Sequence, residues 1–131
     1  MLIIYDFISY TDVFTYNITT LGNGFEFATI NQPDDYEGKV VATVIRKQCS
    51  MPSNKAVLYV HGFNDYFFQS DMAHRFNEKG FHFYAVDLRK YGRSTLPHQK
   101  SNNMRSLTEY FADLDEALDI VRQEGNEQVL L

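Results

Sequence analysis

Two short apolar runs, residues 56–60 and 81–86, stand out along the chain, and each stops abruptly at polar, glycine-bearing residues. Nearly every position in these runs is apolar, which is typical of strands buried on both faces of a helix-covered parallel sheet. Between them, residues 70–79 carry apolar side chains at helical spacing, and Gly80 suits a helix end. Residues 55–94 therefore predict a strand–loop–helix–strand–loop unit, with both loops at the carboxyl ends of strands.

The segment that precedes this unit predicts a β-hairpin. Residues 25–31 and 40–47 are rich in aromatic and β-branched residues, which indicates two strands. The cluster of Pro, Asp and Gly at residues 32–38 indicates the turn between them. We therefore assign residues 25–48 to an antiparallel hairpin, and we treat residues 1–24 as a lead-in that contains at most one short strand.

A second helix is predicted near the end of the chain. The sequence Ser106-Leu107-Thr108-Glu109 forms a capping box, in which a hydroxyl and a carboxylate satisfy the first free N–H groups of a helix. Gly125 ends this helix, and residues 128–131 begin another apolar strand. The face that we expect to pack on the sheet consists of Leu107, Tyr110, Phe111, Leu114, Ala117, Leu118 and Val121.

Together these elements predict an α/β fold, in which the hairpin is followed by a β-α-β-α-β unit over residues 55–131. The three strands of that unit should be parallel, and helices should cover both faces of the sheet in a three-layer α/β/α arrangement. With 131 residues, of which 44% are apolar, the chain can form one domain or part of one. We expect a single, incomplete domain over residues 1–131.

Composition narrows the classes of partner. The formal net charge of −5 gives no electrostatic reason to expect nucleic acid or an anionic membrane surface. The single cysteine, Cys49, excludes an internal disulfide, and no apolar segment is long enough to span a membrane. The amino-terminal residues lack a basic leader and a clear cleavage site, so we expect a mature cytoplasmic protein.

Two motifs carry a resemblance to a known family. Residues 57–63 read V-L-Y-V-H-G-F, and residues 84–94 read Y-A-V-D-L-R-K-Y-G-R-S. In this order and on strand ends, they resemble the α/β-hydrolase fold, and within it the serine aminopeptidase and monoacylglycerol-lipase-like (lysophospholipase-like) branch. The resemblance covers the chain from about Glu26 onward and fits the amino-terminal half of such a domain.

The resemblance implies roles for three residues of the first motif. In the family, the His-Gly loop forms one side of the oxyanion hole, so the backbone N–H of Phe63 is the implied donor. Gly62 would allow an unusual backbone path, and His61 would support the loop rather than transfer protons. In the second motif, Lys90 and Tyr91 stand where relatives usually have glycine and histidine.

The nucleophile of such a hydrolase is missing from the sequence. No G-x-S-x-G motif occurs, because Leu96 follows Gly92-Arg93-Ser94 where the closing glycine belongs. In relatives, the nucleophile follows the strand that begins here at Gln128. We therefore expect an amino-terminal fragment of a serine hydrolase that acts on carboxylic esters, lacks the catalytic Ser, acid and His, and is inactive alone.

The sequence also allows other interpretations of the chain's function. The alternative is a non-catalytic hydrolase-like module that binds a partner or assembles through an exposed strand edge. A nucleotide-binding α/β protein is least favoured, because the only Gly-x-Gly, at residues 22–24, precedes a strand. For the intact protein we expect a small ester or lipid-like substrate and no cofactor.

Several further side chains are candidate functional groups. Asp87 and Arg89 suggest an acid and a carboxylate clamp, but a local ion pair that braces the loop is the favoured interpretation. The aromatic residues 66–68 fit a pocket wall and a core equally well. The remaining histidines, which we interpret as ordinary surface or packing residues, are His74, His82 and His98.

Overall fold

The computed structural model describes residues 15–19, 21–22 and 24–131. The strands are β1 (Asn17–Ile18), β2 (Phe25–Asp35), β3 (Gly38–Lys47), β4 (Lys55–Val60), β5 (His82–Asp87) and β6 (Gln128–Leu130), and the helices are α1 (Ser70–Glu78) and α2 (Phe111–Gln123). The strands form one six-stranded sheet in the order β1-β2-β3-β5-β4-β6. β4, β5 and β6 are parallel, whereas the hairpin strands are antiparallel and join the sheet through β3 and β5. The predicted fold class is thus confirmed.

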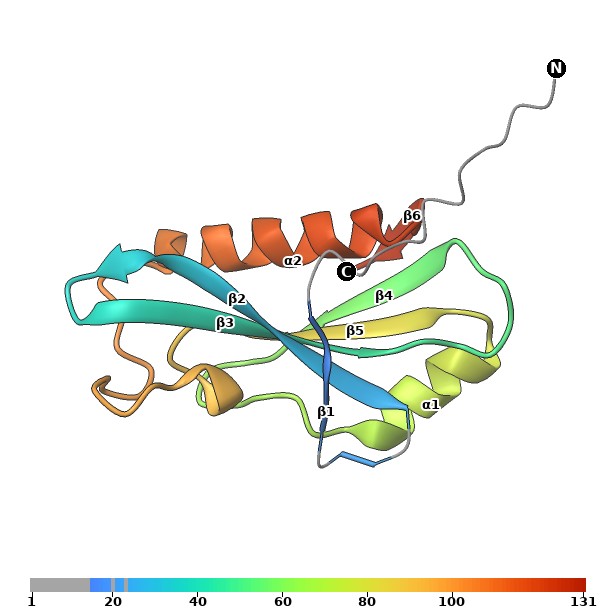
Figure 1. Cartoon of the computed structure of the whole chain (residues 1–131), viewed down its shortest axis with the longest axis horizontal. Helices are drawn as coiled ribbons and strands as arrows, with labels where there is room; N and C mark the ends of the chain where they lie inside the picture. Colours follow the sequence, from blue (N-terminus) through green and yellow to red (C-terminus); the bar gives the residue numbers. More distant parts are fainter. Residues whose placement is uncertain (1–14, 20, 23) are drawn as a thin grey trace, which may run out of the picture.

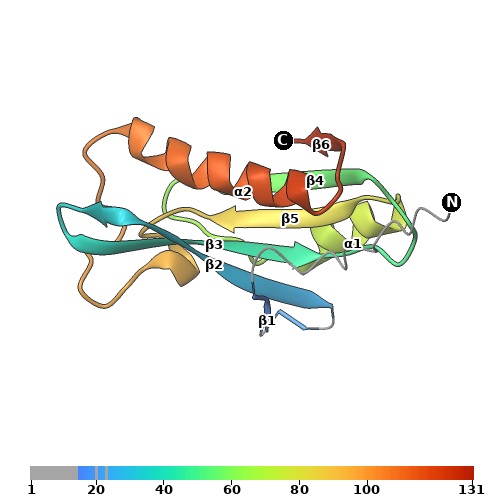
Figure 2. The same ribbon diagram turned by 45° about the horizontal axis from the view of Figure 1, so that its top comes forward.

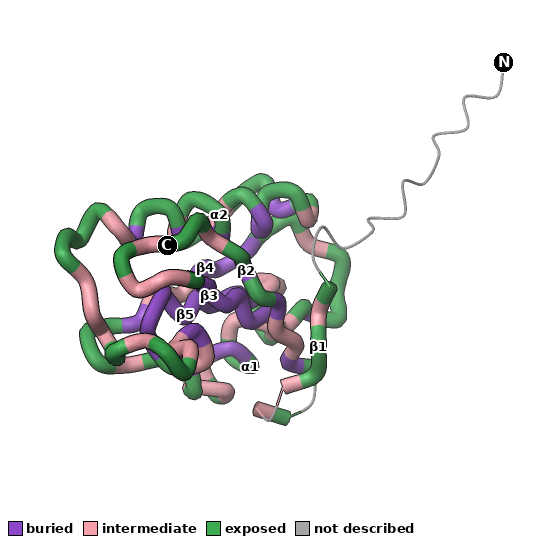
Figure 3. Tube along the Cα trace, turned by 60° about the vertical axis from the view of Figure 1, so that its left-hand side comes forward, coloured by how far each residue is buried: buried purple, intermediate pink, exposed green. Residues whose placement is uncertain are grey.

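The two helices lie on opposite faces of the sheet (Figures 1 and 2). Successive residues of β4 and β5 point to opposite faces, so that Leu58 and Tyr84 pack with α2 while Val57 and Phe83 pack on the α1 side. Both faces are therefore apolar, which explains the continuous apolar runs in the sequence. Figure 3 shows the buried residues concentrated in the central strands, with exposed segments around them.

The hairpin departs from the predicted turn. β2 runs on to Asp35 and β3 begins at Gly38, so most of the segment that the sequence assigned to a turn is strand. The register shifts between Gln32 and Asp35, next to Pro33. A proline has no N–H to donate to a ladder and is tolerated at such an irregularity, so the strand continues past it.

The start of the second helix also differs from the prediction. Ser106 caps a short 3-10 helix, η2 (Leu107–Tyr110), and its hydroxyl accepts a hydrogen bond from the N–H of Thr108 over 3.3 Å. A 3-10 turn has fewer residues per turn than an α-helix, so Leu107 leaves the predicted face and is 65% exposed. Phe111, the first residue of α2, is exposed as well. Ala117 and Val121 pack on the sheet as predicted.

In the lead-in, β1 lies inside the segment where a short strand was expected, while residues 1–14, 20 and 23 lie outside the described residues. Among the helices of the described residues, none is long and apolar enough to cross a membrane.

β6 forms one border of the sheet. It pairs with β4 at three positions, from Lys55–Gln128 to Val57–Leu130, and no strand of the described residues lies along its other side. Leu130 is 53% exposed.

We predict that the 131-residue chain self-associates through this border, because an unpaired apolar strand offers its N–H and C=O groups to a second chain. Leu130→Lys should shift the sedimentation-velocity profile toward the monomer, since a charge on an edge strand opposes pairing. Leu107→Lys is the matched control, as it alters an exposed leucine far from β6. A wild-type chain that sediments as a single monomer at high concentration would contradict the prediction.

Candidate functional site

Two loops meet beyond the carboxyl ends of β4 and β5. His61 begins the first loop, and its Nε2 accepts a hydrogen bond from the N–H of Leu88, just past β5, over 3.0 Å. A backbone N–H can only donate, so Nε2 carries no proton, and the neutral ring carries its proton on Nδ1, 2.8 Å from the carbonyl oxygen of Gly62. The ring also packs on that of Tyr91, with 4.8 Å between the centroids. His61 therefore joins the two loops.

The left-handed residue of the first loop is Asn64, with φ +55°, a conformation that asparagine tolerates better than most residues. Gly62 lies outside the left-handed region, and a Cβ atom at this position would meet no atom within 4 Å. Neither a left-handed φ nor a close non-adjacent atom therefore requires glycine at this position. What the glycine provides is open space beside Phe63.

Phe63 projects from this loop into solvent. Its side chain is 77% exposed, and its ring lies edge-on to that of Tyr91 with 6.4 Å between the centroids. Its backbone N–H has no hydrogen-bond partner within residues 15–19, 21–22 and 24–131. Phe63 therefore combines an exposed side chain with a backbone N–H that has no partner among the described residues.

Asp87 and Arg89 each form an ion pair that braces the second loop, but with other partners and not with each other. The buried carboxylate of Asp87 accepts a hydrogen bond from the N–H of Phe67 over 3.0 Å and pairs with Arg93 over 2.9 Å. Arg89 forms a two-fold contact with Asp113 of α2, over 3.0 and 2.9 Å. Asp87 thus braces the second loop through Arg93 of the same loop, and Arg89 braces it through the distant Asp113.

Ser94 lies in the 3-10 helix η1 (Gly92–Ser94) and is fully buried. Its hydroxyl donates to the carbonyl oxygen of Asp87 over 2.7 Å and lies 2.9 Å from the Thr43 hydroxyl. Gly92, with φ +44°, passes so close to Tyr66 that a Cβ atom would collide with that side chain. The Gly92-Arg93-Ser94 turn is thus a packed support, and its serine hydroxyl is engaged and shielded from solvent.

The three aromatic residues after the first loop divide between the two roles that the sequence left open. Phe67 is fully buried in the core on the α1 side and packs on Phe83, with 5.2 Å between ring centroids. Tyr66 and Phe68 are largely exposed, and their rings lie 5.6 Å apart. Only Phe67 is therefore a core residue, and the other two remain at the surface beside the loop.

The other histidines lie away from His61 and Phe63. His82 accepts a hydrogen bond from the N–H of Cys49 over 3.1 Å, and its Nε2 lies 3.2 Å from the carbonyl oxygen of Ser53. His74 contacts Lys47, and His98 contacts the carbonyl oxygen of Lys39. No cluster of His, Cys, Asp or Glu that could hold a metal ion occurs within the part of the chain that the structure describes.

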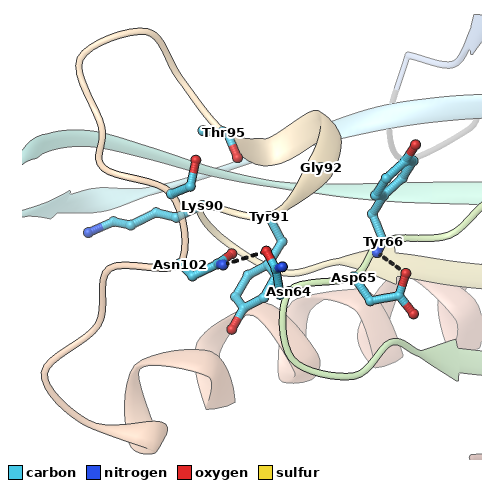
Figure 4. Close-up of a pocket in the computed structure, with 9 residues that line it drawn as sticks. Asn64, Asp65, Tyr66, Lys90, Tyr91, Gly92, Thr95 and Asn102 are labelled. Carbon is cyan, nitrogen blue, oxygen red and sulfur yellow. Dashed lines mark hydrogen bonds between the residues drawn. The ribbon is translucent and has the colours of Figure 1, made fainter.

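A polar cavity of about 370 Å³ lies between the two loops (Figure 4). One wall is the segment from Asn64 to Tyr66, and the other is the turn at Gly92 and Thr95. The amide of Asn102 donates to that of Asn64 over 2.9 Å across one side. No local pattern in the sequence indicates this cavity, because its walls come from separate segments of the chain.

Lys90 is a feature that the sequence analysis did not foresee. It is a non-glycine residue with φ +62°, and it is only 1% exposed. Its ammonium group lies 2.6 Å from a carboxylate oxygen of Asp35 and 2.6 Å from one of Glu37, both at the tip of the hairpin. Burial alone lowers the pKa of Lys90, but the two carboxylates outweigh it and raise that pKa above its ordinary value. Hydrogen bonds from Lys90 and from the backbone N–H of Lys100 together lower the pKa of Glu37 to about 2.

Residues 51–131 match the protein family described as serine aminopeptidase, S33. No curated protein is significantly similar to the chain. Among solved structures, a thermostable carboxyl esterase from Bacillus coagulans in complex with glycerol superposes with a TM-score of 0.62, at 18% identity, over 78% of this chain and 34% of the esterase.

Two further solved structures share the fold. A soluble variant of monoglyceride lipase from Saccharomyces cerevisiae, in complex with a substrate analogue, superposes with a TM-score of 0.53 at 20% identity, over 70% of this chain and 30% of the lipase. DcsB, in complex with its substrate analogue, superposes with a TM-score of 0.56 at 18% identity, over 79% of this chain and 35% of DcsB. The chain thus spans about a third of the length of these proteins. The resemblance inferred from the two sequence motifs is confirmed.

The geometry at His61 predicts which ring nitrogen carries the proton. In ¹⁵N NMR spectra of the imidazole rings at neutral pH, His61 should be protonated on Nδ1, because Nε2 accepts from Leu88. His82 is the internal control and should be protonated on Nε2, because its Nδ1 accepts from the N–H of Cys49. A proton on Nε2 of His61 would be incompatible with the joined loops.

Proposed function

Because this chain belongs to the serine aminopeptidase S33 family, we propose that it forms the amino-terminal part of a serine hydrolase that cleaves carboxylic esters through an acyl-enzyme. Its solved structural neighbours include a carboxyl esterase and a monoglyceride lipase, which supports esters over peptides as the substrate class. The coverage of about a third of those proteins supports the view that other residues complete the catalytic centre.

The observation that carries this proposal is the unpaired N–H of Phe63 at the end of β4. Acyl transfer places negative charge on the carbonyl oxygen of the ester, and a preorganised N–H stabilises that charge without reorganising. The bonds of His61 to Leu88 and Gly62 hold the loop that presents this N–H. Open space in front of Gly62 leaves room for the ester group.

The arrangement of the sheet supports a proposed position for the nucleophile. β6 lies beside β4 and runs parallel to it, so residues that follow β6 would emerge at the same end of the sheet as Phe63. We propose that the nucleophilic serine follows β6, at a strand-to-helix turn, and that the acid and the histidine come later in the chain. Phe63 would then donate to the oxyanion formed at that serine.

In the proposed hydrolase, Phe63→Pro should lower kcat by about 100- to 1,000-fold, because proline removes the N–H donor. Phe63→Ala is the matched control, since it removes the same side chain and keeps the N–H. Steady-state kinetics with a short-chain ester, together with a thermal melt of each variant, measure the effect. Equal activity of the two variants would rule out Phe63 as an oxyanion donor.

The 131-residue chain alone should not react with a fluorophosphonate probe, because Ser94, the serine of its G-x-S sequence, is buried and hydrogen-bonded. Mass spectrometry after incubation measures labelling at every serine. A coding sequence that continues in frame beyond Leu131 and soon encodes G-x-S-x-G would supply the reactive protein as the positive control. A labelled serine in the 131-residue chain would contradict the proposed division of the active site.

A further inference from the structure

Lys90 holds a backbone conformation that lysine adopts rarely. Its φ of +62° lies in the left-handed region, where a Cβ atom is unfavourable and where glycine is the usual residue. A strained position of this kind persists only when its surroundings hold it in place. Two backbone hydrogen bonds help to hold this conformation. The N–H of Lys90 donates to the carbonyl oxygen of Ser94 over 3.2 Å, and the carbonyl oxygen of Lys90 accepts from the N–H of Asn102 over 2.9 Å.

The side chain of Lys90 is held from a distant part of the sequence. Its ammonium group lies between the carboxylates of Asp35 and Glu37, 2.6 Å from each, and 4.4 Å from the ring centroid of Tyr36. These three residues form the tip of the β2–β3 hairpin, which we call the hairpin tip. Figure 4 shows the Lys90 side chain pointing away from Asp65 and Tyr66. Its charge therefore pairs with the hairpin tip and not with the first loop.

The backbone of Lys90 leads directly to Tyr91, which contacts the first loop at His61 and Phe63; we call this first loop the oxyanion loop. The next residue, Tyr91, is buried, and its ring packs on His61 and lies edge-on to Phe63. The hydroxyl of Tyr110 donates to that of Tyr91 over 3.0 Å and fixes the far end of the ring. A change of φ at Lys90 would move Tyr91 and, with it, the support of His61.

We propose that Lys90 is a positioning residue for the oxyanion loop. The carboxylates of the hairpin tip hold its left-handed backbone through the ammonium group, and that backbone sets Tyr91 against His61. The role in catalysis rests on the proposed function, but the mechanical link is a property of this chain alone. It can therefore be measured without any hydrolase activity.

The experiment neutralises the hairpin tip and follows one amide in the 131-residue chain. In the double variant Asp35→Asn, Glu37→Gln, we expect the Leu88 amide, which donates to His61, to exchange with solvent faster by about tenfold or more relative to the Ala85 amide at the centre of β5. The His61 ring should then show both tautomers in ¹⁵N NMR spectra. The matched control is Glu127→Gln, which removes a carboxylate from the other end of the sheet and should change neither reading.

Two substitutions at Lys90 then separate backbone strain from unpaired charge. Added to the neutralised hairpin tip, Lys90→Gly and Lys90→Met both remove the buried ammonium group, but only glycine adopts the left-handed conformation without strain. We expect Lys90→Gly to restore the slow exchange of Leu88 and Lys90→Met to leave it fast. The proposal is overturned if the neutralised tip leaves the ratio of Leu88 to Ala85 exchange unchanged, or if glycine and methionine restore it equally.

In the proposed hydrolase, the same series should lower kcat in the neutralised variant, with KM little changed, and recover it with Lys90→Gly. If Lys90→Gly restores slow exchange of Leu88 but the unaltered hydrolase cleaves no ester, the result counts against the proposed function alone. Altered kcat with unchanged Leu88 exchange would count against the positioning role alone.

Discussion

The parallel pairing of β4 and β5 is the constraint on which the rest of the structure depends. Their register places Val60 beside Val86, so the residues that follow each strand emerge next to one another. His61 can therefore accept from Leu88, and one hydrogen bond joins two segments that lie 27 residues apart. The pairing in turn exists because both strands are apolar on both faces and must be covered by helices on each side.

The ion pairs and hydrogen bonds of buried polar groups hold the two loops in place. Asp87 holds the first loop through Phe67 and the second through Arg93, while Arg89 fastens the second loop to α2 through Asp113. Buried charges are tolerated when they are paired and hydrogen-bonded. Removal of one partner leaves the other charge buried and unpaired, which strongly destabilises the folded state. These groups therefore fix the loops in place, and none of them is free to act on a substrate.

The elements that could be predicted from the sequence are those set by local pattern. Contiguous apolar runs located β4 and β5, helical spacing located α1, and the two motifs located the loops that follow β4 and β5. Contacts between distant segments could not be predicted. Nothing near Lys90 in the sequence indicates that Asp35 and Glu37 will enclose its ammonium group. The bulge near Pro33 could not be predicted either, because it depends on pairing with the neighbouring strand. Without knowledge of that strand, a cluster of Pro and Asp indicates a turn. Likewise, a His-Gly motif suggested conformational freedom at Gly62, whereas the structure uses the left-handed region at Asn64.

A comparison of Lys90 with a glycine at the same position suggests how such a loop can be held in two ways. Glycine adopts the left-handed conformation at little cost in the folded chain, but it loses more conformational entropy on folding than other residues. Lysine reverses this balance, because its strain in the folded chain is offset by contacts to the hairpin tip that glycine cannot make. The position of Tyr91, and of the His61 loop beneath it, then depends on a hairpin that lies outside the two motifs. In the proposed hydrolase, the oxyanion donor would accordingly be set by residues that no inspection of the motifs alone would identify.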